Sequence, residues 1–321
     1  MLGLKKKSHV SIELKDYIVR TLVKKGAEPA SWEVKELALP SGIVTDTTIV
    51  DEMGLYELMK SNLSMFGGKN QNARIFVPDT SVLLKTIEHP KEVKTEGLRE
   101  YVQMELGRSI HLPFQEPLLD VYDYNPEDGQ AVIFAVPPDE VNKFIGVLED
   151  VNLQPEAADI RALCNIRLLE TLDILNENEV YLIADWSINE LSICIYSNSN
   201  VEFLRYQTID TDVTKWTSRE ENGTVAFTYN DEQDYVNRIT DQVLELDRIL
   251  NFFRFSLHKG EKTVDEIIMM GDNPYLKQIC QLVQDNINTP IYLVDDAIVQ
   301  QKYPNFEAKH AALIGLALKE V

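Results

Sequence analysis

The residue types that most often do catalytic or metal chemistry form no constellation in this chain. Cys164, Cys194 and Cys280 are an odd number of widely spaced thiols without a C-x-x-C pair, which argues for a reducing cytosol and against a disulfide framework or a zinc site. The five histidines do not cluster, and no Ser-His-Asp or Cys-His arrangement is indicated. The G-x-x-x-x-G-K-[ST] loop of P-loop ATPases is also absent from the sequence. These residues therefore point to no enzyme class.

Length and charge set the next limits. A chain of 321 residues suits two lobes of roughly 150 residues each. The formal net charge of −21 disfavours contact with nucleic acid or anionic lipid over most of the surface and favours a basic partner segment. No apolar run is long enough for a transmembrane helix, and no apolar region follows the basic run Lys5–Lys7, so no secretory signal is expected. That run is either a contact to an anionic membrane or a solvated tail.

The order of predicted elements repeats. In the first part, three strands (10–14, 17–23 and 32–39) precede a helix (51–66) and a strand (74–78). After a polar break at 176–179, strands at 181–185, 190–196 and 201–206 precede a long helix and a strand at 264–270. We therefore predict an α/β fold of two duplicated lobes. The first lobe comprises residues 1–79 and 151–176, with an inserted α+β subdomain at 80–150. The second lobe comprises 177–321, with a small insertion at about 210–233.

The long helix, predicted over 234–258, has the clearest periodicity in the chain. Seven apolar residues follow steps of three and four, as one face of a helix requires. They are Val236, Ile239, Val243, Leu246, Leu250, Phe253 and Leu257. This stripe fits a helix packed along a sheet, and a coiled-coil partner is the alternative.

Four short segments follow one another along the chain: I-H-L-P-F at 110–114, G-V-L-E-D-V-N-L-Q-P at 146–155, D-I-R-A-L at 159–163 and L-I-G-L-A-L at 313–318. In this order they resemble one family, the type IV pilus assembly proteins PilM of the actin-like ATPase superfamily, which are related to FtsA. The resemblance implies a duplicated actin-like (ribonuclease H-like) two-lobed fold with a nucleotide site between the lobes. It also implies that the tail of a PilN-like membrane protein binds beside the inserted subdomain.

The family's phosphate-binding hairpins are changed at their key positions. In the first hairpin, Ser11 and Glu13 stand where the family has aspartate and glycine; Lys15 and Asp16, in the same turn, could offset the loss or orient a metal. In the second, Asp185 matches the family aspartate. Five further residues complete these remnants of the nucleotide site. They are Trp186 and Ser187 in place of the second hairpin's glycine, Gly271 and Asp272 in place of an adenosine-binding Gly-Gly, and Gly315, which could instead allow close helix packing.

With these glycines lost, we expect no catalytic residues, no metal and no required cofactor, although weak Mg-ATP binding stays open. The resemblance favours a cytoplasmic scaffold, peripheral at the inner face of the cell membrane, that binds a PilN-like tail and other platform components and could self-associate. Candidate groove residues are Arg99, Gln103, Leu112, Pro113 and Phe114. The alternatives are an active actin-like ATPase or filament former and a type II secretion platform protein.

Overall fold

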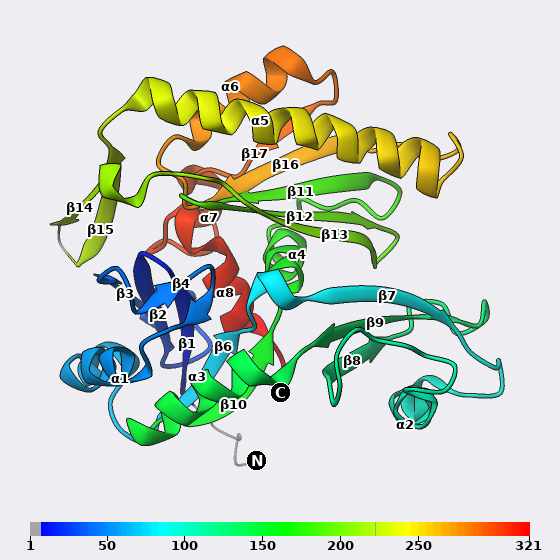
Figure 1. Cartoon of the computed structure of the whole chain (residues 1–321), viewed down its shortest axis with the longest axis horizontal. Coiled ribbons are helices and arrows are strands. Elements are labelled where there is room, and N and C mark those ends of the chain that lie inside the picture. The colour runs from blue at the N-terminus through cyan, green and yellow to red at the C-terminus, as the bar shows by residue number, and fades with distance from the viewer. Residues whose placement is uncertain (1–7, 222) are drawn as a thin grey trace.

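The computed structural model describes residues 8–221 and 223–321, so the run Lys5–Lys7 lies outside the described residues. Its framework is two five-stranded sheets with the same internal order (Figure 1). In each sheet three antiparallel strands form a meander, and two later strands run parallel to the first strand of that meander. The duplication predicted from the repeated order of elements is therefore confirmed.

The strands of the two sheets correspond one to one. The first sheet consists of β1 (His9–Lys15), β2 (Ile18–Lys24), β3 (Glu33–Ala38), β6 (Asn72–Phe76) and β10 (Gln154–Asp159). The second consists of β11 (Val180–Trp186), β12 (Glu190–Ser197), β13 (Asn200–Thr208), β16 (Glu266–Gly271) and β17 (Ile291–Leu293). The short pair β4 (Val44–Thr45) and β5 (Thr48–Ile49) follows β3 and was not predicted.

Helices fill the space between the two sheets and cover their outer sides. The helices of the lobes are α1 (Glu52–Ser61), α3 (Pro138–Asp150), α4 (Arg161–Thr171), α5 (Glu232–Asn251), α6 (Leu276–Asn286), α7 (Asp296–Gln300) and α8 (Ala311–Leu318). α4 and α8 lie against each other between the sheets, and their apolar side chains share one core with residues of both (Figure 1). α8 is apolar all round, as expected of a helix without a solvent face. α5 and α6 cover the far side of the second sheet.

The region inserted in the first lobe contains a three-stranded sheet and one helix. Its elements are β7 (Leu83–Glu88), α2 (Leu98–Glu105), β8 (Leu118–Tyr122) and β9 (Gln130–Val136), with β9 in the middle of the sheet. Alternate residues of β9 point to different cores: Ala131, Ile133 and Ala135 pack with α2, whereas Val132, Phe134 and Val136 join the main core. α3, which the sequence analysis placed inside the insertion, buries its apolar face in that main core.

The second-lobe insertion is a hairpin of β14 (Trp216–Glu221) and β15 (Thr224–Tyr229) that reaches the first lobe. The backbone N–H of Val225 donates to the Glu36 carboxylate at 2.6 Å. The ring of Phe227 meets Tyr17 edge to face with centroids 5.1 Å apart. The hairpin therefore links the second lobe to strand β3 and to the β1–β2 turn of the first.

The middle of the apolar stripe of α5 is buried against the second sheet, whereas Val236 at its start is half-buried. Ile239, Val243 and Leu246 share a core with β11, β12 and β16. The prediction is wrong for Leu257, which is exposed. From Phe252 to Leu257 the helix is a π-helix, labelled η6, and its wider turn takes later residues off the face that a 3.6-residue period predicts.

Candidate functional site

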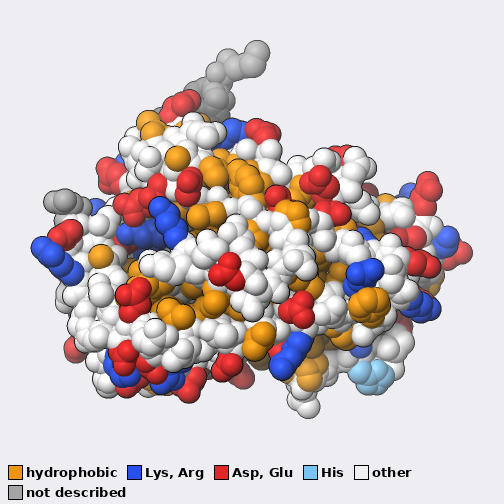
Figure 2. All heavy atoms as spheres, turned by 90° about the horizontal axis from the view of Figure 1, so that it is seen from above, with side chains coloured by type: hydrophobic (Ala, Val, Ile, Leu, Met, Phe, Trp, Pro, Cys, Tyr) orange, Lys and Arg blue, Asp and Glu red, His pale blue; other side chains and the backbone are white. Residues whose placement is uncertain are grey.

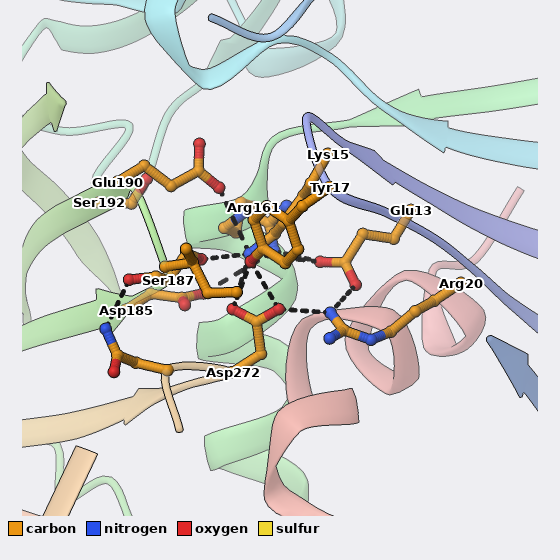
Figure 3. Close-up of polar contacts among 12 residues, drawn as sticks. Glu13, Lys15, Tyr17, Arg20, Arg161, Asp185, Ser187, Glu190, Ser192 and Asp272 are labelled. Carbon is orange, nitrogen blue, oxygen red and sulfur yellow. Dashed lines mark hydrogen bonds and ion pairs between the residues drawn. The ribbon is translucent and has the colours of Figure 1, made fainter. Parts of the chain in front are cut away.

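The β1–β2 turn of the first sheet and the β11–β12 turn of the second sheet meet between the lobes (Figure 3). Lys15, at the end of β1, donates from Nζ to the hydroxyl of Ser187 in the β11–β12 turn. The same Nζ lies 3.3 Å from Glu190 Oε1 and 3.2 Å from Asp272 Oδ1. Lys15 comes from the first lobe and its three partners come from the second, so this ammonium group joins the lobes.

Arg20 forms a second connection between the lobes. Its guanidinium lies 2.8 Å from Glu13 and 2.6 Å from Asp272, and it donates to Glu36 at 3.0 Å. The two-residue turn between β1 and β2 pairs Glu13 directly with Arg20 across the hairpin. Tyr17, in that turn, donates its hydroxyl hydrogen to the Asp272 carboxylate. Asp272 is thus held by three groups of the first lobe, two of them cationic.

Arg161, the first residue of α4, forms the third connection. It donates to Glu13 at 2.7 Å and to Asp79 at 2.9 Å, and lies 4.0 Å from Asp185. Asn165, one turn along α4, donates to Asp185 Oδ2 at 2.7 Å. We call the ionic cluster of Glu13, Lys15, Arg20, Asp79, Arg161, Asp185, Glu190 and Asp272 the lobe-joining network.

The carboxylates of this network differ in whether their pKa is lowered or raised. Burial alone would raise the pKa of Glu13, but Lys15, Arg161 and Arg20 lower it to about 2. The same opposition, with Lys15 and Arg20 prevailing, holds the pKa of Asp272 well below its usual range. For Asp79 burial prevails over Arg161 and raises the pKa to about 6, and burial likewise raises the pKa of Asp185. Glu13 and Asp272 are therefore firmly ionised partners of the three cations.

Five of the nine predicted nucleotide-site residues come together here: Glu13, Lys15, Asp185, Ser187 and Asp272. Lys15 is buried, with 3% of its surface exposed, although it ends β1 directly before the turn. Asp16 points elsewhere and accepts from the backbone N–H groups of Asp46 and Thr47 and from Asn189.

The other three predicted residues have packing roles. The Trp186 side chain is fully buried in the second-lobe core. Gly271 has a φ of +123°, and a Cβ there would meet the Trp186 carbonyl oxygen at 2.1 Å. A Cβ on Gly315 would meet the carbonyl oxygen of Cys164 at 1.9 Å. Gly315 thus permits the close approach of α8 to α4.

Comparison with known proteins identifies the family. The model of the family described as type IV pilus assembly protein PilM matches residues 22–219. This chain belongs to the PilM family. No curated protein matches it significantly.

Solved structures support the fold of this PilM-family chain. The structure of a PilM-PilN type IV pilus biogenesis complex matches with a TM-score of 0.75 at 17% identity, over 97% of both chains. The ethanolamine utilization protein EutJ of Carboxydothermus hydrogenoformans matches with a TM-score of 0.53 at 9% identity, over 98% of this chain and 90% of that one. A Bacteroides thetaiotaomicron protein of actin-like ATPase fold and unknown function gives 0.51 at 11% identity over the full length of both. The predicted actin-like fold is confirmed.

The predicted groove residues of this PilM-family chain do not gather in one cavity. Arg99 and Gln103 lie one turn apart on the exposed side of α2, and Pro113 is exposed. Leu112 and Phe114 are half-buried and pack against the core beneath α2.

A small cavity of about 40 Å³ lies directly at the lobe-joining network, with Lys15, Asp79 and Glu190 in its wall. Two larger cavities adjoin the network on different sides. A cleft of about 760 Å³ includes Gly271, Asp272 and Lys309 in its wall and is bordered by the β15 residues Thr224 to Phe227. A smaller cavity of about 170 Å³ includes Asp79, Asn165 and Ser192 in its wall. Neither the described residues around these cavities nor the rest of the described chain form a group of three or more side chains suited to hold a metal ion.

The sequence analysis missed Arg20, Arg161, Glu36 and Glu190, although three of them had a detectable signal. Arg20 is a lone charge inside an apolar, β-branched strand, and a two-residue turn places it opposite Glu13. Arg161 lies within the D-I-R-A-L segment. Glu190 begins a strand whose following residues are apolar. A charge at such positions in a buried strand or helix start requires a partner.

Proposed function

We propose that this protein is a cytoplasmic scaffold of a type IV pilus assembly platform, or of a related competence or pseudopilus platform. In this proposal it binds the cytoplasmic tail of a PilN-like membrane protein and does not hydrolyse ATP. Membership of the PilM family supports the pathway, and similarity to a PilM solved in complex with PilN supports the kind of partner. No helix among the described residues is long and apolar enough to cross a membrane.

The observation that carries the proposal is the composition of the lobe-joining network. The cationic groups at the turns are already bound by ionised carboxylates: Lys15 by Asp272 and Glu190, and Arg20 by Glu13 and Asp272. A phosphate charge placed about 5 Å from one carboxylate costs about 3 kcal/mol at an effective dielectric of about 20. That cost lowers affinity by roughly two orders of magnitude. The residues present therefore do not fit a tightly bound nucleoside triphosphate, because Glu13 and Asp272 already pair with the cations where the turns meet.

In this proposal the cavity of about 170 Å³ binds the partner's tail. It is walled by Thr80 and Val82 at the start of the inserted region, by α4, and by β12 and β13 of the second sheet. Asn165, which is 1% exposed, has no hydrogen-bond partner for Oδ1. Its orientation is fixed because Nδ2 donates to the Asp185 carboxylate, so Oδ1 is an acceptor without a donor.

An extended segment suits this place. β13 is the edge strand of the second sheet, and edge strands offer free backbone groups to an added strand. A tail lying along β13 would place a short side chain in the cavity. A hydroxyl or amide group on that side chain would donate to Asn165 Oδ1 and remove the cost of the unsatisfied acceptor.

The test is calorimetric titration of the full chain with a peptide of the PilN-like protein's cytoplasmic tail. Ala162→Leu, which extends a side chain into the cavity from α4, should weaken binding at least tenfold. Ala30→Leu, a matched change at an exposed position, should leave binding unchanged. Arg99→Glu tests the groove predicted on α2, where Phe114 is unsuitable because it packs in a core. Equal affinities for the wild type and Ala162→Leu would refute the cavity as the tail site.

The larger cleft is the observation that favours a second candidate function, an actin-like ATPase or filament former. Its volume of about 760 Å³ would admit a nucleotide-sized molecule beside Gly271 and Asp272. In that case phosphate release from Mg-ATP should exceed background and be abolished by Asp185→Asn. Release that Asp185→Asn does not change would reject this candidate.

A further inference from the structure

A patch of exposed aromatic and basic side chains lies at the end of α5. Phe252, Phe255 and Leu257 are 44%, 57% and 44% exposed. Arg254 and Lys259 are exposed between and beside them. We call these five residues the α5-end patch. Figure 2 looks onto the side of the molecule that carries α5 and α6, and orange and blue side chains lie together towards the right, where α5 ends in Figure 1.

The local backbone presents the α5-end patch. The π-helical turn η6 keeps Phe253 fully buried, where its ring lies 4.5 Å from that of His258. Phe252 on one side and Phe255 on the other are left pointing outwards. Gly260 then closes the helix with a φ of +91° and donates its N–H to the Arg254 carbonyl at 2.7 Å. The exposed apolar side chains thus lie on an ordered helical turn that is fixed by the buried Phe253, and not on a loose chain end.

The patch also differs in charge from the rest of the protein. Residues 248–260, which lie between Asp247 and Glu261, contain Arg248, Arg254 and Lys259 and no Asp or Glu, in a chain of net charge −21. Arg248 is paired with Glu245, so Arg254 and Lys259 are the cations that this stretch presents to a partner. At physiological ionic strength the Debye length is about 8 Å, so distant carboxylates are largely screened from a surface that touches the patch.

We propose that the α5-end patch docks on an anionic lipid surface. Phenylalanine and leucine side chains beside arginine and lysine are the composition that binds at the membrane interface, with apolar groups entering the boundary and cations meeting the headgroups. The guanidinium of Arg254 lies 4.9 Å from the centre of the Phe255 ring, so one side of the patch already presents both groups together.

The small area of the α5-end patch favours a lipid surface over a protein partner. A stable protein interface buries about 800 Å² on each side, far more than three side chains supply. Interfacial lipid binding needs only a few inserted side chains together with electrostatic attraction. The adjacent polar cavity of about 360 Å³, near Leu257, is not assigned to the headgroup, because its basic side chains His258 and Lys262 both contact Glu202.

The test is co-sedimentation of the full chain with phosphatidylcholine vesicles, with and without phosphatidylglycerol. We expect binding that requires phosphatidylglycerol and decreases with added salt. Arg254→Gln and Lys259→Gln should each lower the partition coefficient about fivefold, and Phe255→Ser at least as much. Met104→Ser, which removes a similarly exposed apolar side chain from α2, should change nothing. An unchanged thermal midpoint checks that each variant is folded.

Equal sedimentation with both kinds of vesicle, or an equal loss in Met104→Ser, would overturn the proposal. So would self-association in ultracentrifugation that Phe255→Ser abolishes while no vesicle binding occurs, because the patch would then contact a second copy. The inference does not depend on the tail site: Ala162→Leu should retain vesicle binding even if it loses the peptide.

Discussion

Lys15 of β1 and Asp272, the residue after β16, form an ion pair across the two lobes with 3.2 Å between Nζ and Oδ1. Both side chains are buried, and Arg20 shares the same carboxylate. A buried pair is costly to break from one side, because the remaining charge keeps its desolvation cost without compensation. The pair therefore holds the two lobes together through groups that belong to the protein itself.

Replacing Asp272 with Asn should consequently lower the free energy of unfolding by about 3–5 kcal/mol, since Lys15 and Arg20 both lose a charged partner. Urea denaturation measures the loss. The matched control is Lys25→Ala, which breaks a pair with Glu33 that is half exposed, and it should cost less than about 1 kcal/mol. Equal losses in the two variants would contradict the role assigned to Asp272.

Stability should fall in acid because of Glu13 and Glu36. Their pKa values are lowered to about 2, from 4.5, by Lys15, Arg161 and Arg20 around Glu13 and by His310 and Arg20 around Glu36, in both cases against the effect of burial. The unfolded chain binds protons more readily than the folded one in this range, so the contribution is complete above about pH 4.5 and is lost as the pH falls towards 2. The shift corresponds to at most about 3 kcal/mol for each group.

The measurement is the unfolding free energy as a function of pH. Glu36→Gln should be less stable at neutral pH and should show a shallower decline in acid than the wild type. Parallel curves for the two proteins between pH 5 and pH 2 would show that Glu36 does not contribute in this way.

The contribution of Asp79 to stability should depend on pH in the opposite direction. Its pKa is raised by burial to about 6, so the folded protein holds this proton more tightly than the unfolded chain. The contribution of Asp79 is therefore complete below about pH 4 and declines as the pH rises through 6. Asp79→Asn should remove this decline, so its stability relative to the wild type should increase between pH 4 and pH 7. A constant difference over that interval would contradict the raised pKa.

Gly315 should be intolerant of any side chain. Gly315→Ala places a Cβ against the backbone of Cys164, which cannot move without separating α8 from α4, and we expect a loss of at least 1–3 kcal/mol. Gly146→Ala is the control, because Gly146 lies in α3 with no atom within 4 Å of the added Cβ, and it should stabilise by about 0.5–1 kcal/mol. Thermal unfolding of both variants measures the contrast, and a neutral Gly315→Ala would argue against this packing.

The sequence was most informative where periodicity and turns are local. The hairpin of β1 and β2, the duplicated order of strands and the buried face of α5 all follow from patterns within about twenty residues. The exposed position of Leu257 could not be foreseen, because a π-helical turn changes the period without a clear change in composition.

The site was only partly predictable, because its contacts join residues that are far apart in the sequence. A family motif identified Glu13 and Asp272 as altered positions and Lys15 as a cation in the same turn as Glu13. Their meaning depends on Arg20 and Arg161, which become their neighbours only when the sheets and α4 assemble. Likewise, the contact of Val225 with Glu36 joins residues 189 positions apart, and nothing local in the polar insertion indicates it.

We propose that carboxylates of the protein itself, rather than a nucleotide, bind the cations between the lobes. The most direct test is the thermal midpoint of the full chain with and without millimolar Mg-ATP. A ligand at 100 times its dissociation constant would stabilise the protein by about 2.7 kcal/mol, which would raise the midpoint by several degrees. We predict no shift. A reproducible increase that Asp185→Asn removes would contradict the claim and restore a nucleotide to the site.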